Sequence, residues 1–287
     1  MITPVRALAT ACVLATALTA CGTTRAASPS AAPERAPSSA PPSPAAAPSL
    51  SPPPTLAAGP SGLTPVFEHA PRGEDRTVAL TFDADMTADQ GPRAARGEHF
   101  DNPALISTLR SLKIPATVFM TGRWAEEYPD QARSIGRDPL FEVANHSYSH
   151  HAFTDDCYGL PTVPEADMRA DVEQAYAAFR KAGVPHAMPY FRFPGGCYDK
   201  AALRALSASG VTAVQWDVIS GDAFATDADA VARQVLDGVK PGSVVVMHCT
   251  RSAAPTTERA LRTIVPELRR KGYRFVKVSE QIRAAVR

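Results

Sequence analysis

The chain has 287 residues, and its 30 Lys and Arg residues nearly balance its 29 Asp and Glu residues, leaving a formal net charge of +1. With no basic stripe interleaved with aromatic residues and no Gly-rich loop after a strand, the sequence argues against a nucleic-acid partner and a phosphate-binding loop. The part after residue 62 is long enough for one well-buried domain or a single α/β barrel.

The first 20 residues predict a secretory signal. Arg6 precedes an apolar run at 7–18 that is too short to span a bilayer. The small residues before Cys21 resemble a bacterial lipobox, which implies cleavage before Cys21 and a diacylglycerol on its sulfur. We expect a secreted lipoprotein held on the outer face of the membrane; an ordinary cleaved signal with an incidental cysteine is the alternative.

Residues 21–62 predict a disordered tether that follows the anchor. Positions 26–60 are almost entirely Ala, Pro and Ser and hold eleven of the 27 prolines, so this stretch cannot bury a core. As polyproline II, at about 3.1 Å per residue, it would reach about 100 Å. Such a tether would let a membrane-anchored domain work inside a cell wall.

The remaining residues alternate short apolar, β-branched runs with helical patterns. The runs predict strands at 77–82, 116–120, 141–144, 190–193, 213–216, 243–247 and 274–276. Apolar spacing predicts helices at 103–112, 128–135, 166–182, 200–209, 227–239, 256–271 and 279–286. Alternating strands and helices imply a parallel sheet, and seven strands close most of a barrel. We therefore expect a single α/β domain, residues 63–287, built as a distorted (β/α)7-type barrel.

Ionisable side chains stand at the C-terminal ends of five predicted strands. They are Asp83 and Asp85, His146 and His150, Arg192, Asp217 and Asp222, and His248. In parallel α/β folds these strand ends meet at one edge, where the chemistry collects. The pattern alone therefore predicts an active site, with Asp217 a structural hydrogen-bonding residue.

His146 and His150 are four residues apart, and two imidazoles on one helical turn can hold a divalent ion. Three cysteines, Cys157, Cys197 and Cys249, follow the leader. A secreted compartment permits disulfides, but three cysteines allow at most one intrachain bridge. We favour Cys157 with Cys197, although any pair is open.

The five clusters, in this order, resemble the motifs of the polysaccharide deacetylase family, carbohydrate esterase family 4. The residues that carry the resemblance are Thr81-Phe82-Asp83-Ala84-Asp85, His146 to His150, Arg192 with Pro194, positions 216–222, and the apolar run into His248. The stretch 116–124 is similar to the segment that links the first two motifs. The resemblance covers essentially everything after the tether.

The resemblance implies a role for each residue. A divalent cation, with zinc favoured, would be bound by His146 and His150, polarise the acetyl carbonyl and hold the attacking water. Asp83 would be the general base, kept ionised by Arg192, and His248, bonded to Asp222, the general acid. A backbone N–H near Gly195 would stabilise the oxyanion. Apart from the resemblance, Trp216 is either a packing residue or a residue that flanks a sugar-binding groove.

The sequence departs from the family pattern at the third metal ligand. The family has a second Asp where this chain has Ala84, and a methyl group cannot bind zinc. Asp85 would supply the missing carboxylate; otherwise Asp83 itself would ligate. In the fourth motif, Ile219 and Ala223 replace an Asp and a Trp, and Phe224 would cover the apolar patch.

These residues predict a hydrolase of carbon–nitrogen bonds other than peptide bonds, acting as a monomer on an N-acetylated polysaccharide. Peptidoglycan is favoured because of the predicted anchor, with the enzyme extending into the cell wall. A chitooligosaccharide deacetylase and an acetylxylan esterase are alternatives within the same chemistry. A glycan-binding wall lipoprotein with impaired catalysis is the alternative of another class, and a redox protein is disfavoured because no Cys-x-x-Cys is present.

Overall fold

The computed structural model describes residues 52–59 and 61–286. The predicted signal peptide, the lipidation site at Cys21 and most of the predicted tether lie outside the described residues. No helix within the described ranges is long and apolar enough to cross a membrane.

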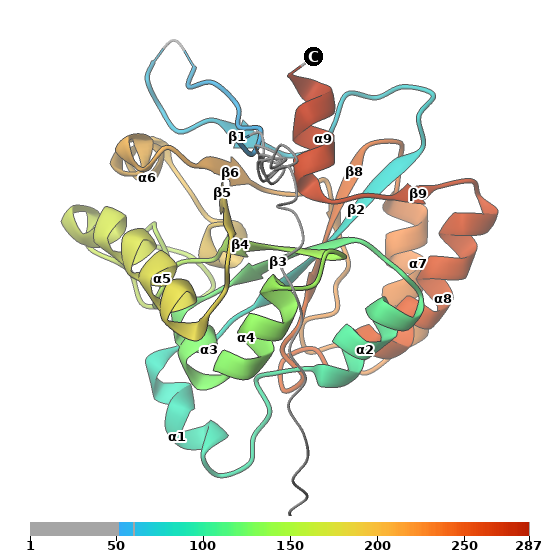
Figure 1. Ribbon diagram of the computed structural model, residues 1–287, viewed down its shortest axis with the longest axis horizontal. Helices are drawn as coiled ribbons and strands as arrows, with labels where there is room; N and C mark the ends of the chain where they lie inside the picture. The colour runs from blue at the N-terminus through green and yellow to red at the C-terminus, as the bar shows by residue number, and fades with distance from the viewer. Residues whose placement is uncertain (1–51, 60, 287) are drawn as a thin grey trace, which may run out of the picture. The chain divides into compact units, whose positions relative to one another are not determined.

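The described chain alternates strands and helices (Figure 1). Its strands are β1 (Val66–Phe67), β2 (Thr77–Ala84), β3 (Ala116–Met120), β4 (Phe141–Asn145), β5 (Ala187–Phe191), β6 (Thr212–Val214), β7 (Val218–Ile219), β8 (Ser243–His248) and β9 (Arg274–Phe275). Its helices are α1 (Gly91–Ala94), α2 (Pro103–Ser111), α3 (Gly122–Glu127), α4 (Pro129–Gly136), α5 (Met168–Ala182), α6 (Lys200–Ala205), α7 (Ala228–Gly238), α8 (Thr257–Arg270) and α9 (Val278–Ala285).

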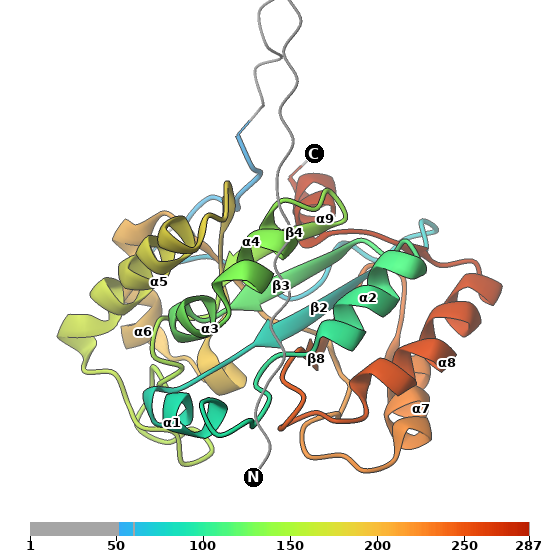
Figure 2. The same ribbon diagram turned by 60° about the horizontal axis from the view of Figure 1, so that its bottom comes forward.

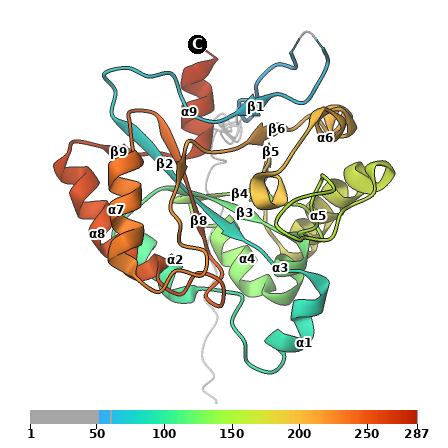
Figure 3. The ribbon, with the colours of Figure 1, turned by 180° about the vertical axis from the view of Figure 1, so that it is seen from behind.

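All strands pair in parallel in a nine-stranded sheet of order β1-β6-β5-β4-β3-β2-β8-β7, with β9 beside β2. No pairing joins the two ends of this order within the described residues, so the sheet is a half-barrel. Seen from behind, β8 lies next to β2, and α7 and α8 stand beside them (Figure 3). This is the expected (β/α)7-type architecture in a single domain.

The central strands have two buried faces because helices cover the outside while side chains fill the inside. Every residue of β2, β3 and β4 is buried. The alternation of side chains along β2 sends Leu80 and Phe82 to the outer, helix-covered core and Ala79 to the inner one. Figure 2 shows α2, α3, α4 and α5 along the helix-covered side of the sheet.

Helix α9 closes the N-terminal end of the half-barrel. Its Val278 and Ile282 pack into the inner core. The buried carboxylate of Glu142 on β4 accepts hydrogen bonds from Ser279 N at 3.0 Å and from Thr117 Oγ1 at 2.8 Å. Burial raises the pKa of Glu142. The inner space is therefore filled at this end, which leaves the opposite, C-terminal strand edge for the predicted chemistry.

Most predicted elements are present, with boundaries shifted by a few residues. The sequence missed β1, β7, α1 and α3, which are short. Some residues before position 63, where the predicted domain begins, already contact the folded domain. Pro54 O accepts a hydrogen bond from Tyr190 at 2.8 Å, and Leu56 N donates to Thr212 Oγ1 at 3.0 Å.

Candidate active site

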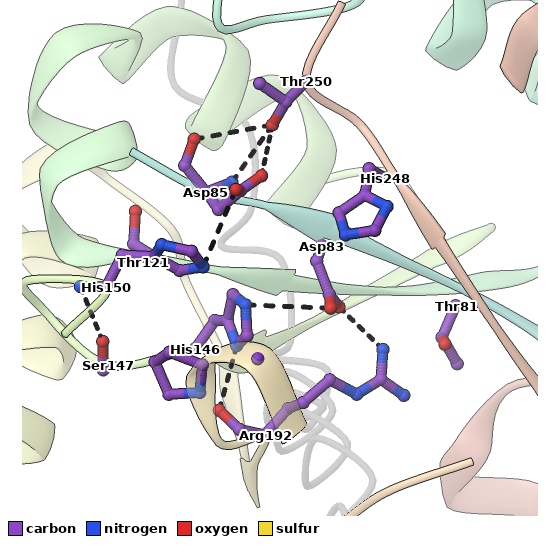
Figure 4. A network of polar contacts seen from close by, with 12 residues as sticks. Thr81, Asp83, Asp85, Thr121, His146, Ser147, His150, Arg192, His248 and Thr250 are labelled. Atoms are coloured by element: carbon purple, nitrogen blue, oxygen red, sulfur yellow. Dashed lines mark hydrogen bonds and ion pairs between the residues drawn. The ribbon is translucent and has the colours of Figure 1, made fainter. Parts of the chain in front are cut away.

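The predicted site residues gather at the C-terminal edge of the sheet (Figure 4). Asp83 is the penultimate residue of β2 and pairs in register with His248, the last residue of β8. His146 directly follows β4, and Arg192 directly follows β5. The parallel register therefore brings together groups that are far apart in the sequence.

A buried ion pair joins Asp83 to Arg192. The guanidinium donates from Nη1 to Asp83 Oδ1 at 2.7 Å and from Nε to Val214 O at 3.2 Å. Its carbon lies 3.9 Å from the centre of the Phe119 ring. Burial lowers the pKa of Arg192, and the adjacent carboxylate offsets part of that effect. The pair fixes one oxygen of Asp83 and leaves the other facing the site.

The two predicted metal-binding histidines lie in a loop, so the expectation that they share a helical turn was wrong. Ser147 and His150 have positive φ values of 69° and 57°, which no helix contains. Asn145 stabilises this path because its Oδ1 accepts from Ser147 N at 2.8 Å. The loop still brings the rings together, with centroids 5.1 Å apart.

Each imidazole presents its Nε2 to a carboxylate. His146 Nδ1 lies 2.9 Å from Arg192 O and must donate there, since a carbonyl only accepts. Nε2 is then the nitrogen that faces the site, 3.7 Å from Asp83 Oδ2. His150 Nε2 lies 3.7 Å from Asp85 Oδ2. Burial, partly offset by Asp85, lowers the pKa of His150 to about 4, so the ring is neutral at pH 7 and can act as a ligand.

Asp85 faces the site because of the pleat of β2. Ala84 is fully buried among the outer-core side chains, whereas Asp83 and Asp85, on either side of it, both face the histidines. Burial would raise the pKa of Asp85, but His150, His248 and the hydroxyl of Thr250 together lower it. The carboxylate is therefore charged at neutral pH.

These donors fit a divalent cation in kind. Two zinc ligands in a tetrahedral site are about 3.3 Å apart, and the 3.7 Å between His150 Nε2 and Asp85 Oδ2 is only a few tenths of an ångström longer. The carbonyl that holds His146 Nδ1 is a partner that metal-bound imidazoles commonly have. As the side chains stand, no three His, Cys, Asp or Glu residues in the described ranges form a complete metal-binding group.

His248 and Asp222 form a second charged pair. His248 Nδ1 donates to Asp222 Oδ1 at 2.8 Å, and His248 N donates to Oδ2 at 2.8 Å. Burial alone would lower the pKa of His248, but the hydrogen bond and charge of Asp222, with the charges of Asp85 and Asp83, raise it to about 9. The imidazolium is therefore the stable form at pH 7.

Gly195 and Trp216 lie beside Arg192. Gly195 has a φ of 65°, and a Cβ there would lie 2.5 Å from Cys157 Sγ, so glycine is needed. Trp216 is half-buried, with its ring 5.3 Å from the Arg192 guanidinium carbon.

The structure pairs Cys157 with Cys197, the favoured disulfide.

Two further residues lie differently from expectation. Asp217 was placed with the site, but β7 separates it from Asp222, and it bonds Ser243 at the start of β8 and Arg72 instead. Its predicted role as a structural hydrogen-bonding residue is confirmed, but it lies at the opposite strand end. Phe224 is 81% exposed and covers no apolar patch, and Ile219 is exposed as well.

Sequence reasoning missed the hydroxyl groups that hold the carboxylates. Thr257 donates to Asp222 Oδ2 at 2.6 Å, Ser220 donates to Oδ1 at 2.9 Å, and Thr250 donates to Asp85 Oδ1. Single threonines and serines in loops carry no pattern from which such partners can be found. Cys249, the remaining cysteine, is buried, and burial raises the pKa of its thiol to about 12.

Known proteins are similar to the part of this chain that carries these site residues. The family model for polysaccharide deacetylase matches residues 70–214. A chitooligosaccharide deacetylase from Bradyrhizobium sp. (strain ANU 289) is 29% identical over 210 residues, covering 69% of this chain and 87% of that protein. A peptidoglycan-N-acetylglucosamine deacetylase from Bacillus cereus is 30% identical over 201 residues, covering 69% and 66%. The crystal structure of a peptidoglycan N-acetylglucosamine deacetylase in a benzamide complex superposes with a TM-score of 0.63 at 25% identity, covering 77% of this chain and 94% of that one.

Proposed function

Because the chain belongs to the polysaccharide deacetylase family, we propose that it is a metal-dependent hydrolase that releases acetate from the N-acetylated sugars of peptidoglycan. The observation that carries the proposal is the meeting, at one strand edge, of a buried Asp–Arg pair, two imidazoles and an Asp–His pair. A protein that only binds glycan needs no such set of proton donors and acceptors.

Asp83 would act as the general base. Arg192 holds its Oδ1, which leaves Oδ2 free to take a proton from the attacking water. As that proton leaves, the water oxygen bonds to the acetyl carbon and the carbonyl oxygen gains charge. A backbone N–H near Gly195 would stabilise that oxyanion.

His248 would act as the general acid. Its Nδ1 proton is held by Asp222, so Nε2 is the nitrogen that delivers a proton to the departing amine. The C–N bond then breaks to give acetate and the free amino sugar. With a pKa of about 9, His248 carries this proton over the whole neutral range.

A divalent cation held by His146, His150 and Asp85, with zinc favoured, would supply a Lewis acid for the acetyl carbonyl and lower the pKa of the attacking water. Asp83 and Asp85 are arranged alike, each with one oxygen anchored and the other 3.7 Å from an imidazole. We assign Asp83 as base because its anchor is the guanidinium that the family pattern pairs with the base, and Asp85 as ligand.

The substrate proposal rests on chemistry and on the predicted location. The two relatives named above act, by name, on chitooligosaccharide and on peptidoglycan N-acetylglucosamine. The lipid anchor predicted at Cys21 and the Ala/Pro/Ser-rich tether favour peptidoglycan. Among N-acetylated polymers, peptidoglycan lies nearest to a domain that is anchored by a lipid to the outer face of the cell membrane. Trp216 would flank the sugar chain.

The test compares acetate release by the purified full chain from peptidoglycan fragments, chitin oligomers and acetylated xylan. We expect release from peptidoglycan to be fastest, and faster release from chitin oligomers would replace the substrate. Asp83→Asn should abolish release while the protein keeps its metal, whereas Asp85→Asn should lose metal and release together. Asp217→Asn, the same change outside the site, serves as control. Metal-loaded protein that releases no acetate from any of the three polymers would favour the glycan-binding alternative.

A further inference from the structure

The turn that follows β2 carries Asp85 and is fastened on two sides. On one side, Thr121 N donates to Ala84 O at 3.0 Å, and Thr121 Oγ1 accepts from Met86 N at 3.1 Å. On the other side, the loop after β8 supplies Thr250. The backbone on both flanks of Asp85 is therefore fixed before its own side chain is considered.

Thr250 contacts Asp85 through one hydroxyl group. That hydroxyl donates to Asp85 Oδ1, accepts from Asp85 N at 3.4 Å and lies 3.5 Å from Asp85 O (Figure 4). Thr250 is only 2% exposed, so water does not compete freely for these positions. The hydroxyl therefore decides where the Asp85 carboxylate points.

The loop that bears Thr250 is itself rigidly placed. Cys249 N donates to Asp83 O at 2.7 Å, which ties the loop to β2. The carbonyl of Thr250 accepts from Ala253 N at 3.1 Å and Ala254 N at 2.7 Å. Since both the donor and the acceptor are anchored, the contact between the hydroxyl and Asp85 costs little additional ordering.

The orientation has a chemical consequence. With Oδ1 held by Thr250, Asp85 Oδ2 faces His150 Nε2 at 3.7 Å, and His150 N in turn donates to Ser147 Oγ at 2.9 Å. One carboxylate oxygen is thus held by a hydrogen bond and the other is presented to the site, as expected for a carboxylate that ligates a metal through one oxygen.

We propose that Thr250 is a positioning residue that orients Asp85 as the third metal ligand and so compensates for the alanine at position 84. The inference rests on the proposed function, because it requires that Asp85 ligates a cation. In this proposal Thr250 holds Asp85, a metal ligand that lies one residue later in the sequence than the carboxylate of the family pattern.

The test is the affinity of the purified full chain, stripped of metal by chelation, for Zn²⁺ in competition with a chromophoric chelator. Thr250→Val keeps the shape of the side chain and removes the hydroxyl, and we expect it to weaken binding about 10- to 100-fold. Thr250→Ser, which retains the hydroxyl, should restore affinity to near the wild-type value. A loss of affinity caused only by the shape or volume of the side chain would not be rescued in this way.

Thr256→Val is the matched control. Thr256 lies in the same loop and is buried, and its hydroxyl has no hydrogen-bond partner among the described residues. The same exchange there should leave the Zn²⁺ affinity unchanged. Thermal melting of all variants without metal separates lost binding from lost folding, because a properly folded Thr250→Val protein with weak binding is the predicted outcome.

Asp85→Asn, alone and combined with Thr250→Val, distinguishes the two levels of the proposal. If Thr250 acts through Asp85, the double variant binds Zn²⁺ no more weakly than Asp85→Asn alone. Full affinity in Thr250→Val with weak binding in Asp85→Asn would overturn the role of Thr250 and leave the ligand assignment standing. Additive losses would overturn it as well. Full affinity in both single variants would overturn the ligand assignment itself.

Discussion

Replacing Asp222 with asparagine should shift the alkaline limb of the pH–activity profile to lower pH. In the wild-type protein Asp222 accepts two hydrogen bonds from His248, one from the ring and one from the backbone, each 2.8 Å long. Asparagine keeps the size of the side chain and loses its charge. The imidazolium then loses its main stabilising partner, while the burial that disfavours it remains.

The size of the shift follows from the pKa of His248. A rise from 6.5 to about 9 corresponds to about 3 kcal/mol in favour of the charged ring. Asp85 and Asp83 would still favour the imidazolium in the variant, so we expect the limb to fall by about two pH units, to about pH 7. At pH 8 the protonated fraction would drop from about 0.9 to about 0.1, a roughly tenfold loss of activity.

The assay is kcat/KM for acetate release from pH 5 to pH 10. Asp222→Asn should approach its highest activity below pH 6 and lose it through pH 7, whereas the wild-type protein should lose activity only near pH 9. Asp217→Asn is the control, because Asp217 bonds Arg72 and Ser243 and does not contact His248. An alkaline limb that stays at the same pH in Asp222→Asn would refute the assignment of His248 as the acid.

Three other outcomes follow from the structure. Arg192→Met should lower the free energy of unfolding by about 3–5 kcal/mol, because it leaves the Asp83 carboxylate buried without its partner; denaturant titration measures this, and an unchanged midpoint would contradict it. Replacing Cys157 and Cys197 with serine should lower it by about 2–4 kcal/mol, and a reducing agent should then change the melting temperature of the wild type only. The pKa of His248 is higher in the folded protein than in the unfolded chain, so its contribution to stability is complete below pH 6.5 and disappears as the pH rises through 9. Denaturant titrations at pH 6 and pH 9 should therefore show a lower free energy of unfolding at the higher pH. A higher free energy of unfolding at pH 9 would contradict the raised pKa.

The sequence predicted best the elements that are apolar on both faces. The strands β2, β3, β4 and β8 read as near-continuous apolar runs because helices cover one face and the inner core the other. Such runs have a recognisable length and composition. The strands β1 and β7 have two residues each, too few for any periodicity, and they exist only because β6 and β8 pair with them.

The sequence predicted the site residues that directly follow strands. It predicted less well the residues whose positions depend on loop geometry, and it did not predict the small polar side chains that hold the carboxylates. Spacing alone could not tell that His146 and His150 lie in a loop, because the positive φ of His150 occurs without glycine. Asp217 was misplaced for a related reason: the unrecognised β7 carries the chain from one end of the sheet to the other before Asp222. Thr250 has no sequence signature, since its role depends on where β2 and β8 end.

The pleat of β2 also bears on how such chains are engineered or judged by motif alone. Ala84 points away from the histidines and packs with Phe82 and Met86 on the outer, helix-covered side. An Ala84→Asp exchange, made to match the family pattern letter by letter, would therefore insert a charge into the hydrophobic core and bring no oxygen to the proposed cation site. In homologues that end β2 at the same residue, the position to inspect for a missing ligand is one step further along the chain.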